Sequence, residues 1–140
     1  MNYGELLFSL LVSLQTVFKK KINIQNVSFP QILAISIIED EGMDMSTIAG
    51  KLGIDNSTAT RLIVGLEKKG WVTRNRSEID SRVVKVYLTP KGEVFQKEIE
   101  EKIDSLGSLF EKGLNSKQKA EFNDQLLSIH WLISKLELKN

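Results

Sequence analysis

The stretch from Asp55 to Arg82, DNSTATRLIVGLEKKGWVTRNRSEIDSR, changes its hydrophobic period part way along. Before Gly70 the apolar residues recur at helical spacing, and after it they alternate as they do in a strand. Asp55 can cap the start of the helix, and Gly70 can close its end. Residues 71–74 and 83–88 predict two strands, and the polar segment between them contains turn-forming residues. The stretch therefore predicts a helix joined directly to a β-hairpin.

A short helix is predicted immediately before this one. Asp44 can cap the segment MSTIAGKLG, and Gly53 can stop it. Two helices joined by a turn of about three residues form a helix-turn-helix, and the hairpin makes it the winged version of that motif. Further upstream, Ser28 can cap a core helix that we expect to run to about Asp40, with Gly42 ending it.

Apolar stripes at helical spacing occupy both ends of the chain. Residues 5–20 carry a stripe that is broader than one small core needs from a terminal helix. A helix starting at Thr89-Pro90 and a last helix capped by Asn115 show apolar residues at heptad-like intervals, which suit side-by-side packing of helices. We therefore expect the terminal helices to pair with a second copy of the chain.

Charge is unevenly distributed, although the formal total is only +1. Residues 44–91 contain nine Lys or Arg against five Asp or Glu, a net charge of +4, and the remainder carries −3. A basic centre flanked by mildly acidic helices suits a surface that binds a polyanion, since phosphates need positive charge only where they touch. Random scatter of surface charge is the alternative.

The residue types present exclude several kinds of chemistry. The 140 residues contain no Cys, which excludes disulfides, thiolate catalysis and cysteine-ligated zinc. The single histidine, His130, argues against a histidine-rich metal site, and its position beside Trp131 in an apolar helix predicts a partly buried structural role. No glycine-rich phosphate loop and no nucleophile with its base is recognisable, so we expect neither an enzyme nor a cofactor.

The apolar segment LLFSLLVSL near the N-terminus is neither a signal peptide nor a membrane span. Three lysines, 19–21, follow the segment instead of preceding it, and polar residues interrupt the apolar run. The segment is also too short to cross a bilayer. We expect a cytoplasmic protein with no membrane partner.

The polar face of the helix that begins after Asp55 supplies the first candidate site. Short hydroxyl and amide side chains can approach base edges or phosphates closely, and Arg61 can donate two bonds to a guanine. A plain solvated helix face is the alternative. At the start of the preceding helix, Ser46 and Thr47 together with Lys51 could receive a phosphate. The candidates on the second helix are Asn56, Ser57, Thr58, Thr60, Arg61 and Lys68.

The predicted hairpin supplies the second candidate site. Arg74, Arg76 and Arg82 cluster in sequence with Asp80. An arginine at the tip of such a loop can insert into a narrow minor groove, where the negative potential is strongest. Asp80 facing phosphates would be unfavourable, so we expect it to hold Arg74 or Arg82 by a charge-assisted hydrogen bond. An ordinary surface ion pair is the alternative.

Three segments carry a resemblance to a known family. They are SFPQILAI, STIAGKLGIDNSTATRLIVGLEKKGWVTR and the hairpin IDSRVVKVYLTPKG with its Asp80-x-Arg82 pair. Together they lie between Ser28 and Gly92, and this region resembles the MarR family of bacterial and archaeal winged-helix transcriptional regulators. The resemblance implies a dimer formed by the first and last helices. It also implies recognition helices in successive major grooves and wings in minor grooves.

Carried over residue by residue, the resemblance assigns DNA contacts to both candidate sites. Ser57, Thr58, Thr60 and Arg61 would lie in the major groove, and Arg82 would reach the minor groove with Asp80 orienting the wing. Family branches that sense oxidants or zinc through cysteine or several histidines are disfavoured here. Other members bind small aromatic acids between the dimerisation helices and the DNA-binding lobe, and some bind no known effector, so a small aromatic or anionic effector stays open.

The predicted fold class is mainly α with a small β-hairpin, a winged helix-turn-helix domain with N- and C-terminal dimerisation helices. We expect one domain over residues 1–140, with a DNA-binding lobe at 28–92 and helical dimerisation regions at 1–27 and 93–140. The predicted function is sequence-specific binding of double-stranded DNA by a homodimeric transcriptional regulator, a repressor acting on a palindromic operator. The alternative is a winged-helix protein-interaction module without sequence-specific DNA binding.

Overall fold

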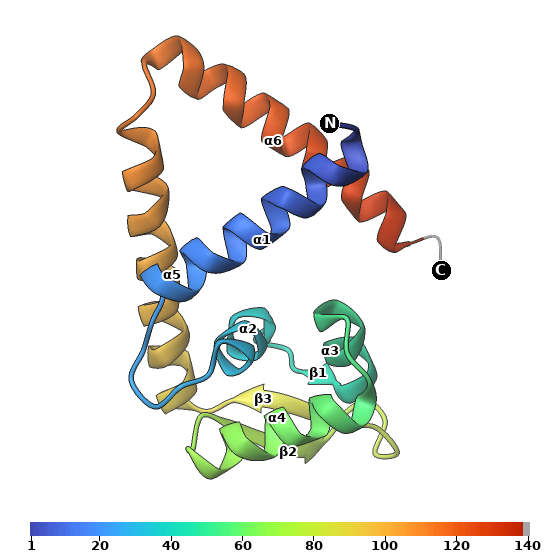
Figure 1. The fold of residues 1–140 in the computed structure, drawn as a ribbon. Helices are drawn as coiled ribbons and strands as arrows, with labels where there is room; N and C mark the ends of the chain where they lie inside the picture. The colour runs from blue at the N-terminus through green and yellow to red at the C-terminus, as the bar shows by residue number, and fades with distance from the viewer. Residues whose placement is uncertain (139–140) are drawn as a thin grey trace. The chain divides into compact units, whose positions relative to one another are not determined.

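Six helices and three short strands make up residues 1–138, which are the residues that the computed structural model describes (Figure 1). Two compact units divide the chain, one covering Met1–Ile103 and the other beginning at Asp104. The order of elements is α1 (Tyr3–Lys21), α2 (Phe29–Ile37), β1 (Met43–Asp44), α3 (Met45–Leu52), α4 (Asn56–Lys68), β2 (Val72–Arg76), β3 (Val84–Leu88), α5 (Pro90–Glu111) and α6 (Ser116–Glu137). The predicted mainly α fold with a hairpin is confirmed.

The three strands form one antiparallel sheet in the order β1-β3-β2. Val86 of β3 lies opposite Arg74 of β2 and opposite Met43 of β1. Strand β1 has only two residues and was not predicted, because a segment that short carries no alternation of its own. It matters for the site, since it ties the start of α3 to the hairpin.

The core of the first unit is built from aliphatic side chains of α2 to α5 and of the sheet. Ile35 of α2, Ile48 of α3, Ile63 of α4, Val86 of β3 and Ile99 of α5 are almost completely buried. Each occupies the inner face that the helical or strand period assigns to it. Burial of this kind fixes α4 against the sheet and leaves its opposite face outward.

The helix starts confirm the predicted caps. Asp44 and Asp55 each accept a backbone N–H from three residues ahead at 2.7 Å, at the starts of α3 and α4. Ser28 forms a reciprocal capping box at the start of α2, and Asn115 forms another at the start of α6. The Thr89 hydroxyl accepts the N–H of Gly92 at 3.0 Å in the first turn of α5.

Helix α2 ends earlier than predicted. It stops at Ile37 and not near Asp40, because Ile38 turns into an extended conformation with its side chain buried. The Gln96 side chain of α5 donates to the carbonyl oxygens of Ile35 and Ile38, both at 2.9 Å, and so satisfies free carbonyls at the helix end. The predicted stop at Gly42 closes the following turn instead, with a φ of 82°.

Helices α1 and α6 bury none of their residues within the described chain. Large apolar side chains are exposed along both, including Phe8 at 67% in α1 and Leu127 at 62% and Trp131 at 58% in α6. His130 of α6 is exposed, so the expected partly buried role is wrong for the single chain. Among the described residues, no helix is both long and apolar enough to cross a membrane.

Candidate nucleic-acid interface

The turn between α3 and α4 is built from backbone hydrogen bonds and one left-handed residue. Gly53 has a φ of 68°, which closes α3, and the N–H of Ile54 returns to the carbonyl of Ala49 at 3.0 Å. Asp55 then caps α4 at once. The Asn56 amide lies 3.5 Å from the Ser46 hydroxyl, so the polar starts of the two helices lie side by side.

Helix α4 is anchored by its inner face. Ala59, Ile63 and Leu66 are completely buried, as expected, whereas Leu62 is only half-buried. Gly65 allows close packing against α2, since a Cβ there would lie 3.1 Å from the amide nitrogen of Gln31. The neighbour is the end of a side chain, so an alanine at Gly65 requires only a small shift of Gln31.

The outer face of α4 carries the predicted polar residues, but two of its hydroxyls are engaged within the helix. The Thr60 hydroxyl donates to the Asn56 carbonyl at 2.8 Å, and the Arg61 guanidinium donates to the Thr58 hydroxyl at 3.3 Å. Thr58 and Thr60 are half-buried. The exposed members of the predicted set are Asn56, Ser57, Arg61 and Lys68.

At the start of α3, Ser46 and Thr47 are exposed as expected. Lys51, at the other end of the helix, contacts the Glu39 carboxylate at 3.5 Å. Both side chains of this pair are about half exposed, so the interaction is weak and Lys51 can leave it for another anion.

The tip of the wing, residues 77–83, is a closed hydrogen-bonded turn. The N–H of Ser77 donates to the Val83 carbonyl at 2.8 Å, and the Val83 N–H donates to the Asp80 carbonyl at 3.0 Å. The buried Ser77 hydroxyl accepts the N–H groups of Ile79 and Asp80 at 3.3 and 3.5 Å. The tip therefore has a defined backbone.

Asp80 was predicted to pair with Arg74 or with Arg82, and it pairs with Arg82. The Asp80 carboxylate accepts Nε and Nη2 of Arg82 at 3.1 and 3.2 Å, and it also accepts the Arg82 backbone N–H at 3.1 Å. The Arg82 side chain, followed by its backbone N–H, lowers the pKa of Asp80 below its usual range. The Arg82 side chain stays 89% exposed, so the guanidinium is oriented and still accessible.

Arg74 and Arg76 do not join this pair, so the predicted arginine cluster around Asp80 is wrong. Two nitrogens of Arg74 contact the Glu67 carboxylate of α4 at 3.0 and 3.3 Å, and Arg76 donates to the Ser81 carbonyl at 2.7 Å. Strand alternation explains the difference, because Arg74 lies opposite Val86 and so shares the face of the sheet that packs on the helices. Glu67 was missed, because the alternation shows which face of the sheet Arg74 occupies but not which residue of α4 lies against it.

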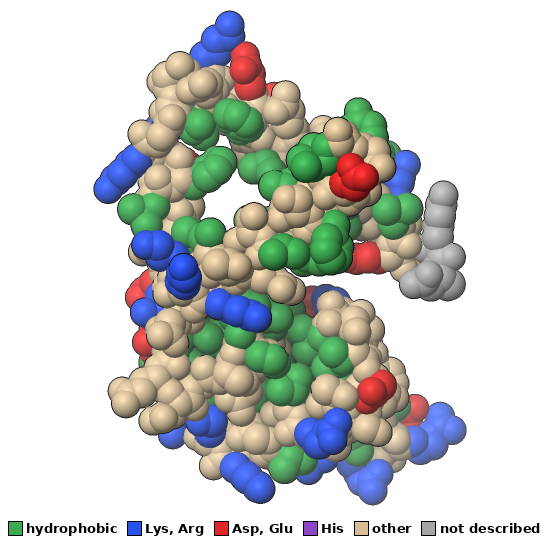
Figure 2. All heavy atoms as spheres, viewed as in Figure 1, with side chains coloured by type: hydrophobic (Ala, Val, Ile, Leu, Met, Phe, Trp, Pro, Cys, Tyr) green, Lys and Arg blue, Asp and Glu red, His purple; other side chains and the backbone are tan. Residues whose placement is uncertain are grey.

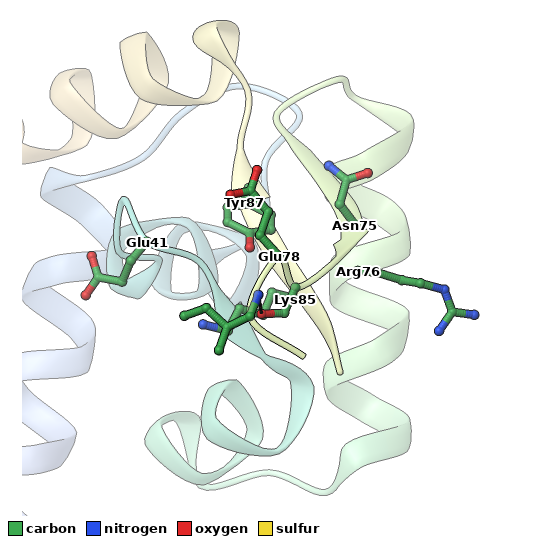
Figure 3. Close-up of a pocket in the computed structure, with 8 residues that line it drawn as sticks. Glu41, Asn75, Arg76, Glu78, Lys85 and Tyr87 are labelled. Atoms are coloured by element: carbon green, nitrogen blue, oxygen red, sulfur yellow. Dashed lines mark hydrogen bonds between the residues drawn. The ribbon is translucent and has the colours of Figure 1, made fainter. Parts of the chain in front are cut away.

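A surface cavity of about 450 Å³ lies on the other face of the sheet, at the base of the wing (Figure 3). Lys85 and Tyr87 of β3 and Asn75 of β2 line it, together with Glu41 and Glu78 from the adjoining loops. The Arg76 side chain points away from the other labelled residues. None of these five residues was among the predicted site residues.

The edge formed by α4 and the wing is rich in basic side chains, which Figure 2 shows gathered along the lower rim. The exposed arginines and lysines that belong to α4 and the wing are Arg61, Lys68, Arg74, Arg76 and Arg82. A helix-turn-helix whose second helix presents an outward polar face, beside a basic wing, defines a winged-helix DNA-binding protein.

Comparison with known proteins identifies the family. The MarR family model matches residues 27–84. The chain is 33% identical over 125 residues to the organic hydroperoxide resistance transcriptional regulator of Bacillus subtilis, covering 88% of this chain and 81% of that protein. The chain belongs to the MarR family and is a DNA-binding transcriptional regulator.

Two solved structures share the fold. FabT of Streptococcus pneumoniae, solved in complex with DNA, has a TM-score of 0.77 at 21% identity over 96% of this chain and 99% of its own. CouR of Rhodococcus jostii RHA1, solved with bound p-coumaroyl-CoA, has a TM-score of 0.74 at 20% identity over 91% of each chain. At these identities the likeness establishes the fold alone.

Proposed function

We propose that the protein acts as a homodimeric repressor that binds a palindromic operator in double-stranded DNA. The observation that carries this proposal is the division of α4 into a completely buried inner face and an exposed polar start beside a basic wing. That arrangement offers a rigid helix of the width that a major groove admits. The proposed activity is cytoplasmic, since the ligand is chromosomal DNA.

The proposed contacts fall into three groups. Major-groove contacts come from the outward face of α4, phosphate contacts come from α3, and wing contacts come from the hairpin. The proposed major-groove residues of α4 are Asn56, Ser57, Thr58, Thr60, Arg61 and Lys68. The proposed phosphate-contacting residues of α3 are Ser46, Thr47 and Lys51. The proposed wing residues are Arg74, Arg76, Asp80 and Arg82. Asp80 acts by orienting Arg82 and not by touching DNA.

The exposed apolar faces of α1 and α6 support the homodimer. Each helix shows several large apolar side chains to solvent, more than an isolated chain of this size needs to leave uncovered. A two-fold dimer presents its recognition helices to half-sites about 34 Å apart, which is one turn of DNA. Analytical ultracentrifugation should show a dimer, and a monomer at micromolar concentration would contradict the proposal.

Operator selection from a random pool of duplexes tests the DNA-binding part. The wild-type protein should enrich a palindrome and bind it far more tightly than a scrambled duplex, with an affinity that falls steeply as salt rises. Equal affinity for all duplexes would refute sequence-specific binding. Absence of salt-dependent retention on DNA resin would favour a protein-interaction module.

We propose a small aromatic or anionic compound as the class of effector to test first. CouR, which shares the fold, was solved with bound p-coumaroyl-CoA. Oxidant sensing through a thiol is not available to these 140 residues, because they contain no cysteine. An effector must bind the free protein and the DNA-bound protein with different affinity. A thermal-shift screen of aromatic carboxylates followed by gel shift tests this, and no release by any compound would contradict it.

A further inference from the structure

The wing tip, residues 77–83, carries one aliphatic side chain that is almost fully exposed to solvent. Ile79 is 95% exposed, more than any other isoleucine among the described residues. Single exposed aliphatic residues are common on proteins and need no explanation by themselves. Ile79 differs because the backbone that carries it is hydrogen-bonded within the turn. Its side chain lies at the rim of the cavity at the base of the wing and remains almost fully exposed.

The hydrogen bonds of the turn fix the backbone at Ile79. The buried Ser77 hydroxyl accepts the backbone N–H groups of Ile79 and Asp80, and Asp80 in turn accepts three bonds from Arg82. Arg76 closes the other side through the Ser81 carbonyl at 2.7 Å. The same framework therefore orients the Arg82 guanidinium and displays the Ile79 side chain.

Charge alone gives this tip little attraction for DNA. Residues 77–83 contain two acids, Glu78 and Asp80, against one base, Arg82, which is a net charge of −1. The Asp80 carboxylate also partly offsets the field of the guanidinium it holds. A tip of this composition that approaches DNA needs a favourable contact that does not depend on charge.

The minor groove offers such a contact. Its walls are deoxyribose rings, and proteins that bind there use isoleucine among the apolar side chains that they insert. We propose that Ile79 is a DNA-contacting residue whose side chain packs against the minor-groove sugars beside Arg82. The inference rests on the proposed DNA-binding function and adds an apolar contact to it.

Substitution of Ile79 on the selected operator duplex tests the proposal by two independent readouts. Ile79→Ala should weaken binding about tenfold for each wing, the change expected when roughly half the surface of three aliphatic carbons is no longer removed from water. The slope of log affinity against log salt should stay that of wild type, because no phosphate contact is lost. Ile79→Leu should retain most of the affinity, and Leu33→Ala, at an exposed leucine of α2, should retain all of it.

Hydroxyl-radical footprinting locates the contact, since the radicals attack deoxyribose from the minor groove. Wild type should protect sugars outside the major-groove half-sites, and Ile79→Ala should restore cleavage there while protection at the half-sites remains. Unchanged affinity of Ile79→Ala, or a salt slope that falls with it, would overturn the role of Ile79 and leave the proposed function intact. Failure of wild type to select any duplex would instead refute the proposed function.

Discussion

A single methyl group at Gly92 should destabilise the DNA-binding unit severely. A Cβ added there would lie 1.9 Å from the carbonyl oxygen of Trp71 and 2.9 Å from its carbonyl carbon. Both are backbone atoms, so no rotamer change relieves the overlap. The start of α5 and the backbone at Trp71, immediately before β2, have to move apart by about 1 Å before even the tightest Cβ contacts found in proteins are reached.

The contacts around Gly92 set the size of the effect. Movement of α5 strains the hydrogen bond from the Thr89 N–H to the Trp71 carbonyl, 3.0 Å long, and the stacking of Trp71 on Phe95 at 4.1 Å. The hydrogen bond and the stacked pair each contribute about 1 kcal/mol, and overpacking costs about 1–3 kcal/mol. Alanine regains at most about 1 kcal/mol of helix propensity. We expect Gly92→Ala to lower the free energy of unfolding by about 2–4 kcal/mol.

Urea unfolding followed by circular dichroism at fixed protein concentration measures this loss. Gly107 provides a matched control, because it lies in the same helix and a Cβ there meets nothing within 4 Å. Gly107→Ala should leave stability unchanged or raise it by up to about 1 kcal/mol. A Gly92→Ala protein within about 0.5 kcal/mol of wild type would refute the reasoning, since normal scatter among surface substitutions is of that size.

Three further predictions address the wing, the end of α2 and the cap of α4. Arg82→Ala should weaken operator binding and flatten its salt dependence by about one neutralised phosphate charge per wing, as measured by fluorescence anisotropy; unchanged affinity and slope would remove Arg82 from the proposed wing contacts. Gln96→Ala should cost about 1–3 kcal/mol in urea unfolding, because two carbonyls at the end of α2 lose their donor, whereas Lys97→Ala beside it should cost little. Asp55 has its pKa lowered, chiefly by the Thr58 backbone N–H, so its stabilisation of α4 is complete above the ordinary value of 3.8 and is lost as pH falls below it. Asp55→Asn should cap without titrating, and the stability gap between wild type and this variant should change only below about pH 4.

Local chemistry made the helix starts predictable. The cap at Asp55 and the capping box of Asn115 with Gln118 involve residues three apart, so spacing alone identifies them. The pair between Asp80 and Arg82 was within reach for the same reason. Features of this kind depend on the backbone conformation of one turn and not on the rest of the fold.

Features that depend on distant elements were not predictable in the same way. The early end of α2 depends on Gln96, which lies 58 residues beyond Ile38 in the chain. The segment FPQILAISI is almost entirely apolar, so its period could not show that Ile32 and Ile35 are buried while Leu33 is 42% exposed. Proximity in sequence likewise grouped Arg74 with the wing tip, although strand alternation turns it towards Glu67.

The contact between Glu67 and Arg74 links the two elements that are proposed to contact DNA, helix α4 and the wing. It joins α4 to β2 by a two-point pair, and only Lys69, Gly70 and Trp71 separate those elements along the chain. The carbonyl of Lys69 accepts the Lys91 ammonium at 3.0 Å, which further fixes the connection. A displacement of α4 therefore carries the root of the wing with it. The proposed major-groove and minor-groove contacts are thus expected to be gained or lost together, so a ligand that displaces α4 alters both by one movement.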